Sequence, residues 1–462
     1  MQRGQSLLPS DATGRVLDRL AGLEQVIPPS ALRQALAATG RVNQRACTLT
    51  YEVICWVVLA MGLFTDLPIR QVFKHARRLR PGEDSPHRSS LCVARQRLGV
   101  APLRHLFTQT VRPLAQPTTP GAFYRGLRLM GLDGTVLDVP DTPANAAAFG
   151  RPSAGPRGEG AFPQIRKLSL VELGTHVEVA FVLKSSDCGE PSMVAGLWRH
   201  LTPEMLLIWD RGFISYELWN QAVSRGVKLL ARGTSRLVLR PIRTLADGSY
   251  LSKLYRNDSD RQKDRHGIVV RVIRYTLDDP QRVGHGEEHV LITNLLDEQC
   301  YPAMELIPLY HERWEEELVF DEQKTHHDPR RATKPAALRS ETPAGVIQEI
   351  YALSLGHFVI RSLMFAAAAT VHLDPDRLSF SGCFQILKCR LPECDSSSSQ
   401  SFEEWYRGLL WEMQGERTDE RRNRINPRVI KQKMSKWKKK RPEHQHLPPL
   451  KKSFLESVVM IR

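Results

Sequence analysis

The chain has 462 residues, of which 42% are hydrophobic and 25% are charged. These proportions are typical of a globular protein and exclude a chain that is disordered throughout. Lys and Arg number 65 against 50 Asp and Glu, and the formal net charge of +15 favours a polyanionic partner, most simply a nucleic acid. The longest apolar run, Val53–Phe64, is shorter than the roughly 20 residues of a membrane span, so we expect a core helix and no membrane partner.

Eight cysteines in so long a chain do not suggest a dense disulfide framework, and the first residues lack the pattern of a secretory leader. We therefore expect free thiols in a reducing cytosol. Cys383, Cys389 and Cys394 lie close together, but their spacing is not that of a zinc site.

Residues 1–118 are predicted to form a helical N-terminal domain, because helix formers with periodic apolar positions recur along them. The first expected helices lie at Ala31–Ala38, Tyr51–Gly62 and Ile69–Leu79. The stretch Ser90–Phe107 then reads as two short helices, with Gly99 ending the first and Pro102 opening the second.

Positive charge on this helix pair is the feature that bears on function. A helix pair joined by a tight turn can dock on DNA, and its basic side chains would then meet phosphates. A solvated helical hairpin is the alternative. The side chains concerned are Arg95, Arg97 and Arg104.

From about residue 119 the pattern changes to strands. Antiparallel strands followed by a strand–helix–strand order predict a mixed α/β layer. A Gly- and Pro-rich loop is expected at Asn145–Ala161, and a helical segment at Ser192–His200. The other elements, in chain order, are strands at Arg128–Leu132 and Val136–Val139 as a hairpin, strands at Gln164–Leu173 and His176–Lys184, a strand at Met205–Trp209, a helix at Tyr216–Ser224 and a strand at Val227–Ala231.

The chain becomes β-rich and more polar at about 233–300, which we interpret as an insertion, with a charged loop at Arg256–His266. Helix is expected again from Ala303 to Lys324 and from Pro343 to Ala369. We place C-terminal helices at 346–415 and a basic tail at 416–462.

The basic tail carries 11 Lys or Arg and no acid between Arg421 and Arg441. Such a run can follow a DNA backbone, giving affinity that is independent of sequence and sensitive to salt. A solvated, disordered segment is the alternative. The residues that we single out there are Lys436, Trp437 and Lys438.

Two aspartates each directly follow an apolar strand, Asp133 after LRLMGL and Asp210 after MLLIW. Carboxyl ends of strands often hold catalytic groups, and a pair of carboxylates suits Mg²⁺ or Mn²⁺. The alternative is that Asp133 begins a hairpin turn and that Asp210 caps a helix.

The segment YHERWEEELVFDEQK supplies a third group. At about 100° per residue, Tyr310, Arg313, Glu317 and Lys324 share one face of a single helix. Asp321 lies near that face and is the rival acid. An amphipathic helix with charged pairs is the alternative.

Together these residues resemble a known family. Tyr310, Arg313, Glu317 and Lys324 match the Tyr-Arg-Glu-Lys signature of the IS-four family of bacterial insertion-sequence transposases. GLDGT around Asp133 and WDRGF around Asp210 resemble the first and second acidic blocks of that family. Similar segments in the helical N-terminus and the basic tail extend the resemblance over nearly the whole chain.

The resemblance implies an α/β fold with an RNase H-like catalytic domain at 119–345. It implies that Asp133, Asp210 and Glu317 form a DDE triad, with the β-rich stretch as an insertion domain. The protein would cleave the ends of its own insertion sequence and join them to target DNA. Some relatives form a DNA hairpin and hold a flipped base on an aromatic residue of the insertion; here Tyr250, Tyr255 or Tyr275 would substitute for the missing Trp.

The chemistry explains the three acids. Two Mg²⁺ or Mn²⁺ ions can activate the attacking oxygen and stabilise the leaving oxygen of a phosphodiester. We expect Asp133 to bridge both ions, Asp210 to complete one shell and Glu317 the other. Phosphate contacts are expected from Arg313, Lys324, Tyr310 and, beside the second acid, Arg211.

The partners expected are the terminal inverted repeats of the element and target DNA, with a homodimer holding paired ends in the cytoplasm at the nucleoid. Two other functions stay open. One is a catalytically inactive DNA-binding derivative that inhibits transposition, and the other is a metal-dependent nuclease that cuts without joining. His326 and His327, directly after the signature, are expected to be exposed histidines at a helix end rather than metal ligands.

Overall fold

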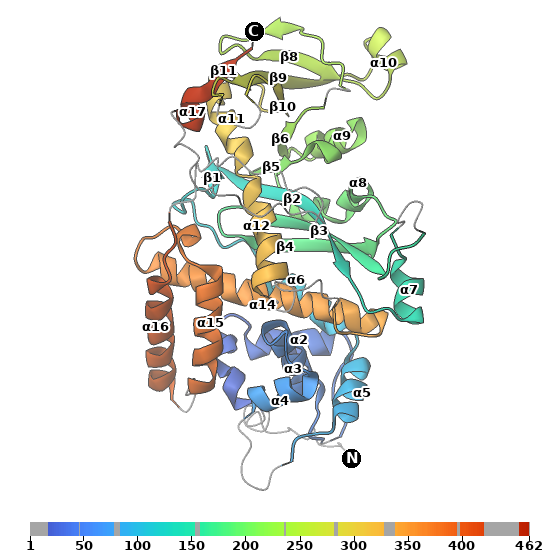
Figure 1. The fold of residues 1–462 in the computed structure, drawn as a ribbon, viewed down its shortest axis with the longest axis vertical. Helices are drawn as coiled ribbons and strands as arrows, with labels where there is room; N and C mark the ends of the chain where they lie inside the picture. Colours follow the sequence, from blue (N-terminus) through green and yellow to red (C-terminus); the bar gives the residue numbers. More distant parts are fainter. Residues whose placement is uncertain are drawn as a thin grey trace, which may run out of the picture. The chain divides into compact units, whose positions relative to one another are not determined.

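The computed structural model describes residues 17–45, 47–77, 84–152, 158–234, 237–280, 285–327, 338–394, 398–419 and 452–461. The chain forms two compact units, coloured along the sequence in Figure 1. Unit 1 contains Met1–Phe123, Asp133–His200 and Glu315–Asp419; unit 2 contains Tyr124–Leu132, Leu201–Trp314 and Glu420–Arg462. Lys436, Trp437 and Lys438 of the predicted basic tail lie outside the described residues.

The N-terminal part of unit 1 is helical, as predicted. After a 3₁₀ helix at Asp18–Gln25, the helices are α2 (Pro29–Ala38), α3 (Tyr51–Leu63), α4 (Ile69–Ala76), α5 (Arg88–Leu98) and α6 (Ala101–Thr110). Gly99, with a φ of 71°, caps α5, and Pro102 lies in the first turn of α6. The two short helices expected between Ser90 and Phe107 are confirmed.

These helices share one apolar core with the C-terminal helices of unit 1, α14 (Pro343–Ala369), α15 (Phe380–Arg390) and α16 (Ser399–Gly415). A Cβ added to Gly62 of α3 would lie 2.0 Å from the carbonyl oxygen of Ala352, so glycine permits α3 and α14 to touch at the backbone. The helices of the predicted N-terminal domain, 1–118, and those predicted at 346–415 therefore pack around one core.

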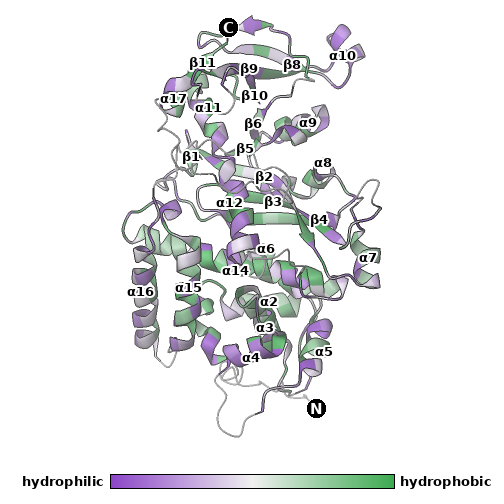
Figure 2. Ribbon diagram, in the orientation of Figure 1, coloured by the Kyte–Doolittle hydropathy of each residue, from purple (hydrophilic) through white to green (hydrophobic). Residues whose placement is uncertain are grey.

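Helix α14 is long and apolar enough to cross a membrane by length and composition, but 72% of its most apolar window is buried inside the protein. Figure 2 shows its hydrophobic colouring beside that of neighbouring elements. Several buried polar side chains also lie on it, among them Glu349, His357 and Arg361. Each bonds to another part of unit 1, which identifies α14 as a core helix.

Unit 1 also contains an antiparallel pair of strands, β3 (Gln164–Glu172) and β4 (Val177–Ser185), in the predicted positions. Two expectations near them need correction. The loop predicted at Asn145–Ala161 begins with a helix, α7 (Pro143–Phe149), because Thr142 caps it and Pro143 opens it. The helical segment at Ser192–His200 is a series of short pieces, beginning with α8 (Glu190–Met193).

The hairpin predicted around Asp133 is instead one continuous strand, β2 (Leu127–Asp138). Its first half belongs to unit 2 and its second half to unit 1. Gly134 is not a turn residue: a Cβ there would lie 2.3 Å from the side chain of Glu190, so the glycine leaves room for that carboxylate. Asp133 therefore lies inside a strand.

In unit 2 the first half of β2 pairs in parallel with β5 (Met205–Trp209), which pairs in parallel with β6 (Lys228–Arg232). Helix α9 (Tyr216–Ser224) connects β5 to β6 and matches the prediction. The α/β class is confirmed by this strand–helix–strand order.

The β-rich stretch extends this same sheet. Next to β6 come β10 (His289–Thr293), β9 (Ile268–Leu277), β8 (Tyr250–Leu254) and β7 (Arg243–Thr244), all antiparallel to their neighbours, and β11 (Val458–Met460) pairs with β9. The charged loop predicted at Arg256–His266 contains a short helix, α10 (Asp258–Gln262).

The helix predicted from Ala303 to Lys324 is interrupted. α11 (Ala303–His311) ends before a turn at Glu312 and Arg313, α12 (Trp314–Asp321) follows, and Glu322–His326 form a π-helical turn. The single face expected for the four signature residues does not exist in that form, because the turn and the wider π-helix change the angular spacing.

Candidate active site

The first two acids directly follow a pair of matched residues on parallel strands. Leu132 of β2 is paired with Trp209 of β5, and Asp133 and Asp210 are the next residues of the chain. The Asp133 carboxylate accepts a hydrogen bond from the Gly134 N–H at 2.8 Å. The alternative role of Asp210 as a cap is confirmed, because it accepts from the N–H of Gly212 at 2.6 Å.

Unit 2 brings Asp210 near Tyr310 of the signature, and Arg313 lies near the same tyrosine. Tyr310 is 9% exposed, and burial raises the pKa of its phenol. Asp210 raises this pKa further, whereas Arg313 and Arg232 lower it. The hydroxyl is therefore a proton donor at neutral pH. The Arg313 guanidinium lies 4.8 Å from the ring centre of Trp314, and Arg211 is exposed.

Unit 1 contains the other two signature residues. Glu317 is half-buried in the first turn of α12. Lys324 contacts the hydroxyl of Thr135 on β2. Because side chains alternate along a strand, Thr135 shares its face with Asp133. Lys324 and Thr135 also line a small cavity, together with Leu137, Lys167, Gln323, Leu338, Ile350 and Leu353.

Arg95 does not point outward as a DNA contact. Its guanidinium donates hydrogen bonds to Gln348 Oε1 at 2.9 Å, Ser340 Oγ at 2.9 Å and the carbonyl of Gly345 at 2.7 Å. Burial lowers its pKa, an effect that Glu349 opposes. Arg95 thus binds the start of α14 to α5, whereas Arg97, two residues on, is exposed.

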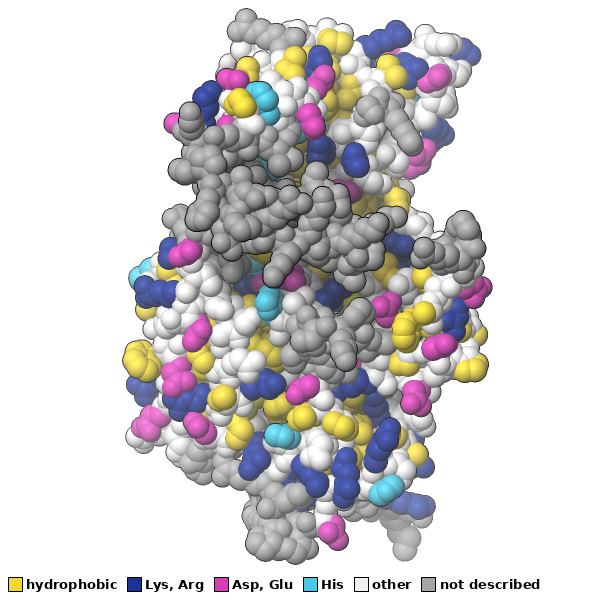
Figure 3. Space-filling view, in the orientation of Figure 1, with side chains coloured by type: hydrophobic (Ala, Val, Ile, Leu, Met, Phe, Trp, Pro, Cys, Tyr) yellow, Lys and Arg dark blue, Asp and Glu magenta, His cyan; other side chains and the backbone are white. Residues whose placement is uncertain are grey.

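An exposed basic surface does exist on α4 and α5. Figure 3 shows Lys and Arg side chains gathered over these helices. The exposed arginines there come from helices that the apolar core of unit 1 holds in place, so their charges have fixed positions. They are Arg70, Arg88 and Arg97.

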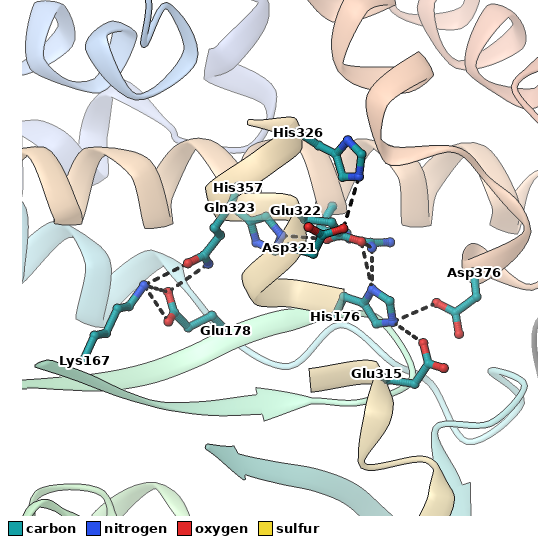
Figure 4. A network of polar contacts seen from close by, with 11 residues as sticks. Lys167, His176, Glu178, Glu315, Asp321, Glu322, Gln323, His326, His357 and Asp376 are labelled. Atoms are coloured by element: carbon teal, nitrogen blue, oxygen red, sulfur yellow. Dashed lines mark hydrogen bonds and ion pairs between the residues drawn. The ribbon is translucent and has the colours of Figure 1, made fainter. Parts of the chain in front are cut away.

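A buried network of acids and bases that no motif predicted lies around α12 (Figure 4). His176, at the turn between β3 and β4, places Nε2 2.7 Å from Glu315 Oε2 and Nδ1 3.1 Å from Glu322 Oε1. Glu322 also accepts from Arg361 Nε at 3.0 Å and lies 2.9 Å from His357 Nε2. One weak indication of this network is present in the sequence. His357 and Arg361 are four residues apart on a helix, so both side chains can face one partner.

Electrostatics define the charge states in this network. Burial and Arg361 would lower the pKa of His176, but the carboxylates of Asp376, Glu322 and Glu315 outweigh them and raise it to about 9. Burial would raise the pKa of Glu322, but Arg361 and His176 hold it well below its usual range. His176 is therefore a cation and Glu322 an anion at neutral pH.

A second buried network flanks the first. Lys167 Nζ lies 2.8 Å from Glu178 Oε2 and donates to Gln323 Oε1 at 3.0 Å and to Ser354 Oγ at 3.0 Å. Gln323, next to Glu322 in the π-helical turn, is thus bound by a charged pair from β3 and β4.

The histidines after the signature differ from each other. His326 is exposed, as expected, and lies 3.3 Å from Asp321. His327 is buried against the rings of Phe380 and Phe384. Burial lowers the pKa of His327 to about 3. The expectation of two exposed histidines is wrong for His327, because the chain turns inward after the π-helix.

The three candidate tyrosines of the β-rich stretch are not equivalent. Tyr275 is 4% exposed and stacks on His289, so its ring has no face for a DNA base. Tyr250 donates to the carbonyl of Leu239 at 3.3 Å, and Tyr255 donates to Asp264 at 2.5 Å. Tyr250 and Tyr255 remain candidates.

Comparisons with known proteins find similarity to transposases. Residues 17–108 match the family model for the insertion element 4 transposase N-terminal, and residues 125–342 match that for the transposase DDE domain. The chain is 29% identical over 450 residues to transposase InsG for insertion sequence element IS4 of Escherichia coli (strain K12), covering 95% of this chain and 98% of that protein. It is 24% identical over 195 residues to the putative transposase InsZ of the same organism, covering 42% and 64%.

A cryo-EM structure of the piggyBac transposase synaptic complex with hairpin DNA aligns with a TM-score of 0.41 and 11% identity, covering 89% of this chain and 88% of that one. The family matches define the class: the chain is a DDE transposase, an enzyme that cleaves DNA and transfers strands. It belongs to the IS-four (IS4) family of insertion-sequence transposases, as the motif resemblance predicted. DNA is its partner, and its DDE domain implies dependence on a divalent metal.

Proposed function

We propose that Asp133, Asp210 and Glu317 are the metal-binding catalytic triad of an RNase H-like core. The observation that carries the proposal is the parallel pairing of Leu132 with Trp209, which the two aspartates directly follow. Carboxyl ends of neighbouring parallel strands meet at one edge of a sheet, where catalytic groups are commonly placed. Glu317 is the acid of the signature, ahead of its rival Asp321, which is exposed and pairs with His326.

The donor chemistry of these residues fits the metal that the family requires. Carboxylate oxygens are the ligands that Mg²⁺ and Mn²⁺ prefer. Asp133, Asp210 and Glu317 would hold two such ions between them through their carboxylate oxygens. Bound there, the ions would supply activation of the attacking oxygen and stabilisation of the leaving oxygen of a phosphodiester, in cleavage and in joining alike.

Cationic side chains would bind the DNA ends. Arg313 offers a planar fork to a phosphate and Lys324 a point charge beside Thr135. Tyr310, kept protonated by burial, donates one more hydrogen bond. Arg211 and the exposed arginines of α4 and α5, Arg97 among them, would contact phosphates farther along the duplex.

The reaction that follows from these parts is cut-and-paste transposition in the cytoplasm, with a homodimer pairing the two element ends. A hairpin intermediate would use Tyr250 or Tyr255 as the aromatic support for a flipped base. In this proposal Arg95 has a structural role and is no longer a DNA contact, because its donors are engaged within unit 1.

The test is cleavage of a DNA fragment carrying the element ends, with Mg²⁺ or Mn²⁺, by the wild type and by Asp133→Ala, Asp210→Ala and Glu317→Ala. Asp187→Ala, an exposed aspartate outside the signature, is the control. We expect metal-dependent cuts at the element boundary that vanish in the three variants and persist in the control. If Glu317→Ala still cuts, the triad assignment is wrong.

The same assay separates the two alternatives. Binding of the ends without cleavage by the wild type would indicate an inactive inhibitor. Cleavage without joining, when a pre-cut end and target DNA are supplied, would indicate a nuclease.

A further inference from the structure

The segment that carries Glu317 and Lys324 is held in place by buried charged residues on both sides of the glutamate. Glu315 precedes Glu317 by two residues and Glu322 follows it by five, and both are buried. Neither acid belongs to the predicted triad. Their partners come from two other parts of unit 1, the β3–β4 turn and the middle of α14.

His176 joins the two acids. One ring nitrogen faces Glu315 at 2.7 Å, and the other faces Glu322 at 3.1 Å and also contacts the guanidinium of Arg361, so a single imidazole ring spans α12 and the start of the π-helical turn (Figure 4). Its backbone is in the left-handed region, with a φ of 58°. Such a conformation is costly for a residue other than glycine and persists only where the surroundings demand it.

Arg361 and His357 hold Glu322 from the other side. Arg361 donates through Nε at 3.0 Å and makes a second contact through its terminal nitrogen, while His357 Nε2 lies 2.9 Å away. All three side chains are at most 6% exposed. A carboxylate held by this many donors has one low-energy position, because any rotation would leave buried charges without partners.

A metal centre is the rival explanation, since His176, Glu315 and Asp376 have donor atoms within 4.8 Å of one another. The distances favour a charged hydrogen bond instead. The 2.7 Å between His176 Nε2 and Glu315 Oε2 is a normal length for such a bond, and two ligands of one ion at the usual bond lengths of about 2.1 Å lie about 3 Å or more apart. Arg361 already brings positive charge to this cluster.

We infer that His176 and Arg361 are positioning residues that fix α12 and the π-helical turn and thereby place the Glu317 carboxylate and the Lys324 ammonium for catalysis. The inference rests on the roles proposed above for Glu317 and Lys324. Neither positioning residue touches the DNA or a reacting atom in this scheme; each acts through the helix that it holds.

This role predicts a specific kinetic signature. A misplacement of about 1 Å in a catalytic group costs roughly a hundredfold in rate, whereas affinity for the DNA ends depends on many phosphate contacts spread over the protein. Loosening the grip on α12 should therefore lower the rate of the chemical step and leave the affinity for DNA nearly unchanged.

The experiment compares His176→Gln and Arg361→Lys, which keep a hydrogen-bond donor, with His176→Ala. Glu349→Gln is the matched control, because it weakens another buried ion pair on α14, that with Arg339 at 3.1 Å, which does not involve α12. For each full-length variant we would measure the melting temperature, the dissociation constant for end DNA and the single-turnover cleavage rate at saturating enzyme, well below the melting temperature.

We expect cleavage to fall by roughly 10- to 100-fold in His176→Ala, with partial recovery in His176→Gln and a dissociation constant within about threefold of the wild type. Glu349→Gln should have a lower melting temperature than the wild type but the same cleavage rate. If His176→Ala and Glu349→Gln lose the same number of degrees in melting temperature and the same factor in cleavage rate, the loss of rate reflects general stability, and the inference is wrong.

Two further outcomes would overturn it. Normal cleavage by His176→Ala and Arg361→Lys, alongside an inactive Glu317→Ala, would refute the positioning role while leaving the triad intact. The purified wild type could instead contain one equivalent of tightly bound metal that both His176→Ala and Asp376→Asn lose. That result would show that this cluster is a metal centre and not a hydrogen-bonded network. An active Glu317→Ala would instead refute the proposed triad.

Discussion

Helix α14 carries two buried charge clusters that look alike and serve different parts of unit 1. In the first, Glu349 accepts from the backbone N–H and the guanidinium of Arg339, each at 3.1 Å, and from Ser340 at 2.8 Å. In the second, His357 and Arg361 bind Glu322. The first cluster holds a segment that joins helical parts of the unit, whereas the second holds the helix of the signature.

Burial of a charge does not by itself reveal its role. Both clusters combine a carboxylate that is at most 6% exposed with an arginine. Removing either carboxylate would strongly destabilise the fold. Only their neighbours differ: Glu322 lies five residues after Glu317, and Glu349 lies on α14 beside Arg95.

The largest effect is expected from removing one carboxylate. Glu322→Ala would leave the charges of His176 and Arg361 buried, which typically costs about 3–5 kcal/mol in the free energy of unfolding. Glu349→Ala should cost less, because the Arg339 side chain is 18% exposed against 3% for Arg361. Urea denaturation of both variants checks this order, and an equal or reversed order would show that exposure does not govern the loss.

Buried histidines make the free energy of unfolding depend on pH with opposite signs. His176, whose pKa is raised to about 9, stabilises the fold fully below its unfolded pKa of about 6.5, and that contribution is lost as the pH rises through about 9. His327, whose pKa is lowered to about 3, stabilises the fold above about 6.5, and its contribution is lost as the pH falls towards 3.

We therefore expect stability to be greatest near pH 6.5, with His176 contributing on the order of 3 kcal/mol and His327 on the order of 5 kcal/mol. Denaturation measured from pH 4 to pH 10 tests this. His176→Gln should flatten the alkaline limb alone, and His327→Phe the acid limb alone. A variant that flattened both limbs would contradict the separate assignment.

A smaller effect is expected where α3 touches α14 between the two clusters. Gly62→Ala would place a methyl group 2.0 Å from the Ala352 carbonyl oxygen, and relieving that overlap should cost about 1–3 kcal/mol. The control is Gly408→Ala in α16, where a Cβ meets nothing within 4 Å and helix propensity predicts a gain of about 0.5–1 kcal/mol. Thermal unfolding of the pair distinguishes packing from propensity, and a stable Gly62→Ala would contradict the close contact.

The smallest effect concerns Lys324, which the second cluster would position. Lys324→Ala should weaken binding of the element ends by about 1 kcal/mol and reduce the dependence of log affinity on log salt by about one ion. Lys184→Ala, an exposed lysine on β4, should change neither. Binding titrations at several salt concentrations measure both quantities, and an unchanged slope for Lys324→Ala would exclude a phosphate contact.

Local patterns predicted much of the fold. Gly99 and Pro102 marked the turn between α5 and α6, and the apolar pattern of Met205–Trp209 marked β5, because caps and buried strands depend on few neighbouring residues. The DDE class and the family also followed from short motifs around Asp133, Asp210 and Glu317, whose spacing along the chain is a property of the sequence alone.

Other features depended on residues far apart in the chain. The Asp-Gly pair at 133–134 has the composition of a turn, yet β2 continues through it, and Glu190 fills the space beside the glycine. Helical periodicity was equally unable to show that the signature helix stops after His311 or that a π-helical turn begins at Glu322.

The order of the residues already defines the chemical groups available to this protein: three acids in the family order, a signature with two cations and a tyrosine, and an excess of positive charge. Which of these charges face outward depends on contacts between segments that are distant in the chain. Arg95 and Arg97 are two residues apart, but only Arg95 meets Gln348 and Ser340 of another segment. A charged side chain can be buried only where groups of opposite charge or hydrogen-bond partners surround it. In a folded chain those partners come from elements that are distant in the sequence.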